Sequence, residues 1–373
     1  MRDISELTTG VVAELLNAMN AGVYLTDRDR RIVFWNRRAQ EITGYTPERV
    51  VGSRCSDDIL MHLDTEGRPM CNSGLCPLNR SMTTNSPSNA PVVVYAKSAS
   101  GERIPLSTSV APIHNEQGEV IGGVEVFRDE RQSMLQMKLA RAVQQQMLID
   151  VFPADDRISF DVEYSPVDVI GGDFYHVEQV SNDVFSMVVI DIEGHGISAA
   201  LYTTLMHSLI HECVDQMGEP AAFMAALNVR LCSRVPQAGL MTAACASLDA
   251  ASRTATYCSA GHPAALFQPG DGGEVRIVEF LGYPLGLDVE TAYASTGFPV
   301  DRGGRLLLYT DGAVEIKTDA NSRLGSHGLA SLLAELPPQG TDHGLEQLYA
   351  SLLKRCSTPM PEDDITLLSC IML

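Results

Sequence analysis

The sequence predicts an α+β protein in which two globular domains are joined by a helical linker. The chain has 373 residues, which is enough for two or three domains. Its C-terminal part places two helices together between pairs of strands, which indicates α+β layering and not regular βαβ winding. A polar stretch without Gly or Pro precedes that part, and acidic turns abut several of its strands.

The first domain is predicted over residues 11–128. It opens with an amphipathic helix over 11–19, and its last part alternates apolar and polar residues as strands do. The other expected elements are strands over 22–26, 31–35, 92–97, 104–113 and 120–127, with short helices over 37–43 and 47–50.

Residues 129–152 are predicted to form a helical, coiled-coil linker. Its sparse apolar stripe follows helical spacing and comprises Leu135, Leu139, Ala142 and Gln146, widened by Met134 and Val143. A helix this short is marginal by itself, so it needs a packing partner. We interpret that partner as a second copy in a homodimer. The alternative is that the helix packs on its own C-terminal domain.

The third region, residues 159–373, carries the remaining strands and helices. Strands are expected over 160–165, 184–190, 242–249, 254–259, 264–268, 306–310 and 365–370. Helices are expected over 197–213, 220–233, 329–336 and 344–354.

Acidic residues stand at the ends of several of these strands. They are Asp173, Asp191, Asp311, Glu315 and the run Glu362–Asp364. A lone Asp before Gly is usually a turn residue, so the hypothesis depends on the whole set. Carboxylates that strand ends bring together can hold hard divalent cations, and two such ions can activate water and clamp a phosphate. The set therefore indicates a metal-dependent phosphohydrolase.

Composition excludes several other classes. The formal net charge is −20 and the pI about 4.8, so nonspecific binding to nucleic acid or to anionic membranes is not expected. The sequence has no apolar run of about eighteen residues and no basic segment before an apolar stretch at its start, so neither a membrane span nor a signal peptide is expected. Nine cysteines in a large acidic chain favour a reduced, cytoplasmic protein.

The first region resembles a PAS sensor domain. The residues that carry the resemblance are AGVYLTDRDRRIVFWNRRAQEITGY and GERIPLSTSVAPIHNEQGEVIGGVEVFRDE. The resemblance implies a five-stranded antiparallel sheet with helices on one side, used for sensing or dimerisation.

The third region resembles the SpoIIE-like branch of the PPM metal-dependent serine/threonine phosphatases. Six motifs occur in the order of that branch: GGDFY, DIEGHG, SAGHP, YPLGL, LLLYTDG and EDDITLL. The resemblance implies an α-β-β-α sandwich with two Mn²⁺ or Mg²⁺ ions at one end. The order of sensor, linker and phosphatase resembles the bacterial general stress phosphatases, which regulate sigma factors.

The phosphatase resemblance also implies roles for single residues. Asp173 and Asp191 would hold the two ions, with Asp191 bridging them, and the carbonyl of Ile192 would complete one ion's shell. Asp311 and Asp363 would bind the second ion, with Asp364 as the next candidate. For His195 two roles stay open, a proton donor to the leaving group or a structural hydrogen-bonding residue; His262 is interpreted as structural. Departures from the common motifs include Glu193, which adds negative charge near the phosphate site, and Ser259.

A second group of metal-ligating residue types lies in the first region. Cys55, His62, Cys71 and Cys76 occur within 22 residues of sequence, and all four types bind soft or borderline metals. A zinc or iron–sulfur site would let the domain sense metal or redox state. The alternative is a set of reduced thiols in an ordinary loop, with His62 on a helix surface.

Together these patterns predict a PAS-regulated, Mn²⁺- or Mg²⁺-dependent phosphoserine/phosphothreonine protein phosphatase. The resemblance implies a phosphorylated STAS-type anti-sigma-factor antagonist as its substrate. Two alternatives are a catalytically silent scaffold with a phosphatase fold and a PAS-linked nucleotide cyclase.

Overall fold

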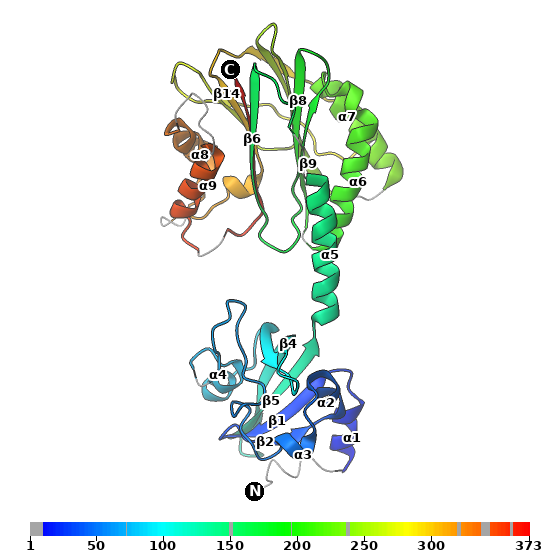
Figure 1. The fold of residues 1–373 in the computed structure, drawn as a ribbon, viewed down its shortest axis with the longest axis vertical. Helices are drawn as coiled ribbons and strands as arrows, with labels where there is room; N and C mark the ends of the chain where they lie inside the picture. The colour runs from blue at the N-terminus through cyan, green and yellow to red at the C-terminus, as the bar shows by residue number, and fades with distance from the viewer. Residues whose placement is uncertain are drawn as a thin grey trace. The chain divides into compact units, whose positions relative to one another are not determined.

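The computed structural model divides into two compact units, Met1–Gln136 and Met137–Leu373 (Figure 1). It describes residues 10–71, 73–148, 152–194, 196–235, 239–318, 322–336, 344–358 and 361–373.

The first unit is built on a five-stranded antiparallel sheet, as the PAS resemblance predicts. In sheet order the strands are β2 (Ile32–Trp35), β1 (Gly22–Asp27), β5 (Val120–Asp129), β4 (Arg103–His114) and β3 (Val92–Lys97). The helices are α1 (Gly10–Ala18), α2 (Arg37–Thr43), α3 (Pro47–Val50) and α4 (Pro77–Thr84). Helix α4 was not predicted, although Pro77 at its first turn and the left-handed Asn85 after its end are typical helix boundaries.

Asn36 ties the start of this unit together. Its Oδ1 caps α2 by accepting from the backbone N–H of Ala39, and it also accepts from Val23. Its Nδ2 donates to the carbonyls of Leu16 and Ala21. One buried side chain therefore joins α1, β1 and α2, because it satisfies backbone groups of all three.

The second unit is a sandwich of two five-stranded sheets. The first sheet contains β13 (Thr296–Pro299), β10 (Thr254–Ala260), β9 (Met241–Asp249), β8 (Val184–Ile192) and β7 (Phe174–Gln179). The second contains β12 (Arg276–Val278), β11 (Ala265–Gln268), β14 (Arg305–Tyr309), β15 (Ile365–Met372) and β6 (Ile158–Ser165). The main core lies between the sheets and includes Val188, Leu306 and Leu368.

Two pairs of helices cover the outer faces of the sandwich (Figure 1). Helices α6 (Ile197–Cys213) and α7 (Pro220–Arg234) pack on the first sheet, and α8 (Gly325–Ala334) and α9 (Gly344–Arg355) pack on the second. This is the predicted α-β-β-α order. The strands β7, β12 and β13 were not predicted; all three form sheet edges, where short segments of mixed polarity give a weak pattern.

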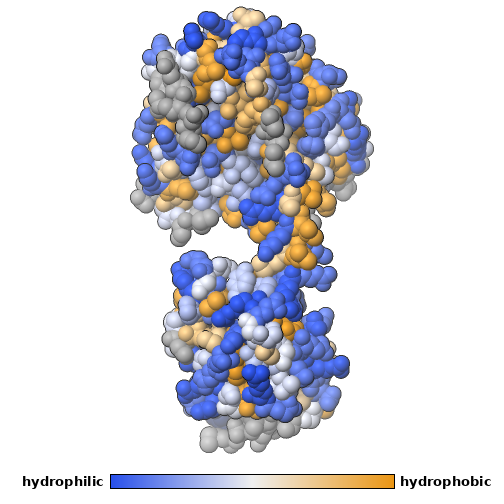
Figure 2. All heavy atoms as spheres, in the orientation of Figure 1, coloured by the Kyte–Doolittle hydropathy of each residue, from blue (hydrophilic) through white to orange (hydrophobic). Residues whose placement is uncertain are grey.

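The linker forms one helix, α5 (Arg131–Leu148), but its buried face is not the predicted stripe. Leu135, Leu139 and Val143 are 57%, 60% and 52% exposed, and Figure 2 shows hydrophobic residues along this helix. The buried side chains are Gln144 and Leu148. Leu148 joins the core of the second unit, and its carbonyl accepts from Tyr175 Oη at 2.8 Å. The C-terminal half of the linker therefore packs on its own C-terminal domain, while the stripe stays exposed.

Candidate active site

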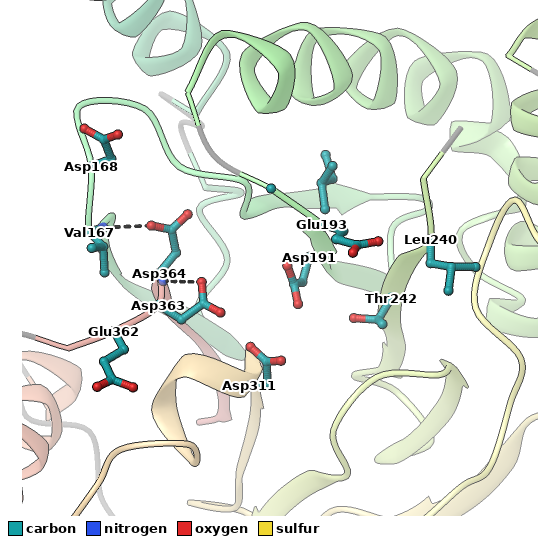
Figure 3. Close-up of a pocket in the computed structure, with 12 residues that line it drawn as sticks. Val167, Asp168, Asp191, Glu193, Leu240, Thr242, Asp311, Glu362, Asp363 and Asp364 are labelled. Atoms are coloured by element: carbon teal, nitrogen blue, oxygen red, sulfur yellow. Dashed lines mark hydrogen bonds between the residues drawn. The ribbon is translucent and has the colours of Figure 1, made fainter. Parts of the chain in front are cut away.

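The predicted acidic turns at Asp191, Asp311 and Glu362–Asp364 converge on one cavity of about 790 Å³ in the second unit, whereas Glu315 lies outside it (Figure 3). Asp191 and Ile192 reach it from the end of β8, Asp311 from the turn after β14, and Asp363 from the segment before β15. Figure 3 shows the carboxylates of Asp191, Asp311 and Asp363 facing a common space. The sandwich therefore brings together residues that lie up to 172 positions apart in the sequence.

Two glycines allow the backbone segments around this cavity to approach one another. A Cβ on Gly172 would lie 2.5 Å from the carbonyl oxygen of Ile192, and a Cβ on Gly312 would lie 2.0 Å from that of Asp364. Real Cβ atoms do not approach so closely, so both positions need glycine for steric reasons. The glycines of the GGD and TDG motifs thus bring their aspartates against the neighbouring strand ends.

Asp173 lies behind the cavity wall and is 2% exposed. Its Oδ2 accepts hydrogen bonds from Thr310 Oγ1 at 2.8 Å and Thr366 Oγ1 at 2.6 Å. Burial, followed by the charge of Asp191, raises the pKa of Asp173 well above its ordinary value, against the effect of the two hydroxyls. Asp173 is thus a buried neighbour of Asp191 that does not itself line the cavity.

Asp364 is fully engaged with the loop opposite. Its Oδ1 accepts from the backbone N–H of Val167 at 2.7 Å, and its Oδ2 accepts from that of Gly172 at 2.6 Å. Asp363, its neighbour, accepts from the N–H of Asp364 at 2.8 Å through Oδ1. Asp364 therefore fixes the loop that carries the GGD motif.

The cavity is strongly acidic. Seven carboxylates line it, and no described lining residue is basic: Asp168, Asp191, Glu193, Asp311, Glu362, Asp363 and Asp364. Burial, then Asp311 and Asp363, raises the pKa of Asp191 to about 7. Burial, then Asp363, raises that of Asp311. These carboxylates destabilise one another's charge, which divalent cations would offset.

The donor set fits hard cations such as Mn²⁺ and Mg²⁺, which prefer oxygen ligands. As the described side chains stand, no three His, Cys, Asp or Glu residues surround a point closely enough to hold an ion. The carboxylates of Asp191, Asp311 and Asp363 nevertheless line one cavity, where cations would find oxygen ligands.

Of the two candidate histidines, His262 is described by the structure and His195 lies outside the described residues. His262 is 6% exposed, its Nδ1 lies 2.7 Å from Thr242 Oγ1, and burial lowers its pKa to about 4. Ser259 exchanges hydrogen bonds with the backbone N–H and carbonyl of His262. His262 is thus a buried, neutral residue, and the hydrogen bonds of Ser259 fix its backbone.

Gln144 of the linker contacts the site loop, which the sequence did not indicate. Its Nε2 donates to the carbonyl of Gly171 at 2.8 Å and to Thr203 Oγ1 of α6 at 3.3 Å. The residue is 3% exposed. It therefore joins the linker, the GGD loop and α6, and a glutamine in a polar helix gives no local signal of such contacts.

The cysteine group of the first unit lies around a buried carboxylate. Cys55, His62 and Cys76 are buried, and Cys71 is half-buried. His62 Nε2 lies 3.6 Å from Glu125 Oε1, and both atoms are buried without a hydrogen-bond partner. Tyr24 Oη donates to Glu125 Oε2 at 2.7 Å.

Burial is also the main cause of a raised thiol pKa in this group. The pKa of Cys55 rises to about 12 through burial, then through the charge of Glu125. Because His62 is buried, it does not lie on a helix surface. Among the described residues, no three ligating side chains surround one point.

Two sheets between helix pairs, with an acidic cavity at their strand ends, define the second unit as a PPM-type phosphatase fold. Residues 181–371 match the family described as Stage II sporulation protein E (SpoIIE), and residues 20–132 match the PAS domain. Because the first match covers half of the sequence, the chain belongs to the SpoIIE family, with a PAS domain before its phosphatase-type domain.

Curated relatives include two phosphoserine phosphatases of Bacillus subtilis (strain 168). RsbP is 30% identical over 184 residues, which are 48% of this chain and 45% of RsbP. RsbU is 24% identical over 233 residues, 62% of this chain and 69% of RsbU. The matched segment thus spans less than half of RsbP and about two thirds of RsbU.

Solved structures share the fold. The SiaA-PP2C domain of Pseudomonas aeruginosa has a TM-score of 0.58 at 24% identity, covering 65% of this chain and 98% of that one. The RsbU and RsbW domains of Rv1364c from Mycobacterium tuberculosis give 0.52 at 26% identity, over 59% and 61% of the two chains. In the part of the chain that the structure describes, no helix is long and apolar enough to span a bilayer.

Proposed function

We propose that the protein is a Mn²⁺- or Mg²⁺-dependent phosphoserine/phosphothreonine protein phosphatase. The observation that carries this proposal is the convergence of Asp191, Asp311 and Asp363 on one cavity, where burial and neighbouring carboxylates raise the pKa of Asp191 and Asp311. Family membership and the names of RsbP and RsbU support it.

Within this proposal, Asp173, Asp191, Asp311, Asp363 and the carbonyl of Ile192 would hold two ions, with the buried Asp173 acting beside Asp191, whose charge it adjoins. When bound, the ions supply charge for the phosphoryl oxygens and activate water. The chain's own residues do the positioning: Asp364 fixes the GGD loop, and Thr310 and Thr366 orient Asp173. Without cations the acidic cavity would repel a phosphoester, so substrate binding itself needs them.

We infer that the substrate is a phosphorylated STAS-domain anti-sigma-factor antagonist. Support comes from the family resemblance and from two relatives named as phosphoserine phosphatases. His195 is proposed either to protonate the leaving serine oxygen or to serve as a structural residue. The cyclase alternative does not agree with membership of the SpoIIE family. The silent scaffold remains the alternative, and catalysis itself separates the two.

We expect hydrolysis of p-nitrophenyl phosphate and of a phosphoserine protein to require Mn²⁺ or Mg²⁺. Chelation by EDTA should stop phosphate release, and adding back the metal should restore it, because the cavity needs cations to accept a phosphoester. Phosphate release can be followed by colorimetry. A rate that is unaffected by EDTA would refute the metal dependence, and no release with either metal would favour the scaffold.

We propose that the PAS domain holds a zinc or iron–sulfur site at Cys55, His62, Cys71 and Cys76. The grouping of these residues around buried, unpartnered atoms of His62 and Glu125 supports it. Elemental analysis of the full chain, purified without added metal, should find zinc or iron. The single variants Cys55→Ser and Cys76→Ser should each lose this metal. Equal metal content in both variants and in the control Cys356→Ser would favour the reduced-thiol interpretation.

We propose a homodimer formed by the PAS domain and the exposed stripe of α5. Leu135, Leu139 and Val143 leave a narrow apolar face in water, which a two-fold partner would bury on both chains. Light scattering should give about twice the 40.4 kDa chain mass. Leu135→Glu with Leu139→Glu should lower that mass, whereas the exposed Gln136→Glu should not. A wild-type monomer at micromolar concentration would contradict the proposal.

A further inference from the structure

Three of the nine histidines gather on the first sheet and its covering helix, and none of them lines the acidic cavity. His176 lies on β7, while His207 and His211 lie one turn apart on α6. The rings of His207 and His211 are 4.4 Å apart between centroids, and those of His176 and His211 are 5.3 Å apart. The cluster continues to Phe174, whose ring meets His207 edge-on.

The spacing of the two helical histidines is that of a chelate. Their Nε2 atoms are 3.1 Å apart. Two nitrogens that each lie about 2.0–2.1 Å from one Zn²⁺ ion, at an angle between square and tetrahedral, are separated by roughly 3.0–3.4 Å. The i, i+4 spacing places both side chains on one face of the helix. The two nitrogens are therefore spaced to bind one metal ion without a change in the helix backbone.

We propose that His207 and His211 chelate a divalent transition metal of the Zn²⁺, Ni²⁺ or Cu²⁺ class. Imidazole nitrogen favours these metals, whereas the carboxylates of the acidic cavity favour Mg²⁺ and Mn²⁺. Since no three ligating side chains among the described residues surround one point, the chain supplies two ligands and water completes the shell. The second unit thus carries two metal sites of different chemistry.

The surroundings allow this site to form. His211 is exposed, so an ion can enter from solvent, whereas His176 is 4% exposed and closes the inner side. The nearest acid on the helix, Glu212, is paired with Arg234 at 2.7 Å, and Glu178 lies 3.3 Å from His176 Nε2. The described carboxylates near the pair are thus engaged elsewhere, and an ion can reach the two imidazoles from the exposed side of His211.

A metal at this position would connect one turn of α6 to the next. This helix is the next helix after strand β8, whose end carries Asp191, and its Thr203 accepts from Gln144 of the linker. Binding should therefore raise the melting temperature of the folded chain, because a ligand that binds only the native state stabilises it.

Calorimetric titration of Ni²⁺ into the full chain, in saturating Mg²⁺, tests the proposal. We expect His207→Gln and His211→Gln each to remove one Ni²⁺ site or weaken it at least about tenfold, and to abolish the Ni²⁺-induced rise in melting temperature. The exposed His327→Gln is the matched control and should behave as wild type. Circular dichroism without Ni²⁺ verifies that the variants fold. Unchanged binding in both variants, or an equal loss in the control, would overturn the proposal.

Discussion

Asp191→Asn should lower the rate of phosphate release on the order of a thousandfold while the chain remains folded. Asp191 faces the cavity from the end of β8 and is the proposed bridge between two ions. The substitution replaces one carboxylate oxygen by an amide nitrogen and removes the negative charge, so both ions would bind more weakly. A loss of about 4 kcal/mol of transition-state stabilisation corresponds to a rate roughly a thousandfold lower. The exposed Asp215→Asn, which lies outside the cavity, is the matched control. Full activity of Asp191→Asn would refute the assignment.

The same substitution should stabilise the protein in EDTA at pH 8, by about 2 kcal/mol after allowance for solvent screening. The pKa of Asp191 is raised to about 7 by burial, then by Asp311 and Asp363. Ionised Asp191 therefore lowers the free energy of unfolding of the wild type. This destabilisation is complete above about pH 7 and disappears as the pH falls towards the ordinary Asp pKa of about 4. The gain measured by urea unfolding should shrink as the pH falls from 7 to 4. A gain that is equal at pH 8 and pH 4.5 would show that the cause is not this charge.

Removal of the linker should be the second large effect. The fragment 159–373 should be less stable and less active than the fragment 137–373, which keeps the packed half of α5. Truncation removes Leu148 from the core, worth about 2 kcal/mol, and the Gln144 bond to the Gly171 carbonyl, worth about 1 kcal/mol. Melting temperature and phosphate release measure both effects. Equal rates and stabilities in the two fragments would mean that the linker does not act through this packing.

A point substitution separates the hydrogen bonds from the loss of helix. Gln144→Ala in the full chain should lower the free energy of unfolding by about 1 kcal/mol. It should also change the rate of phosphate release, because the GGD loop loses a hydrogen-bond donor. Its exposed neighbour Gln145→Ala should change neither. If the two variants behave alike, Gln144 has no special position in the site.

The sequence predicted the parts of the site that are local. Acidic turns after apolar runs indicated Asp191, Asp311 and Asp363, and the structure brings all three to one cavity. Most strands of the three sheets followed from their apolar patterns. The exceptions were the edge strands β7, β12 and β13 and helix α4, whose mixed polarity gives no clear periodicity.

Long-range contacts of polar residues could not be predicted. Thr310 and Thr366 hold Asp173 from strands that read only as apolar runs, and Glu125 lies far along the chain from the cysteines it adjoins. Gln144, in a polar helix beside the apolar stripe, gives no local signal of burial, yet it is buried and contacts Thr203 of α6. Each of these contacts depends on the tertiary fold, so neither residue spacing nor composition predicts it.

Anomalous diffraction from crystals soaked in Mn²⁺ tests the central claim most directly, since it locates the ions without reference to activity. The proposed function predicts two Mn²⁺ peaks in the cavity, both in contact with Asp191, with Asp311 and Asp363 on one of them. A cavity without Mn²⁺ peaks at a concentration that supports turnover would contradict it.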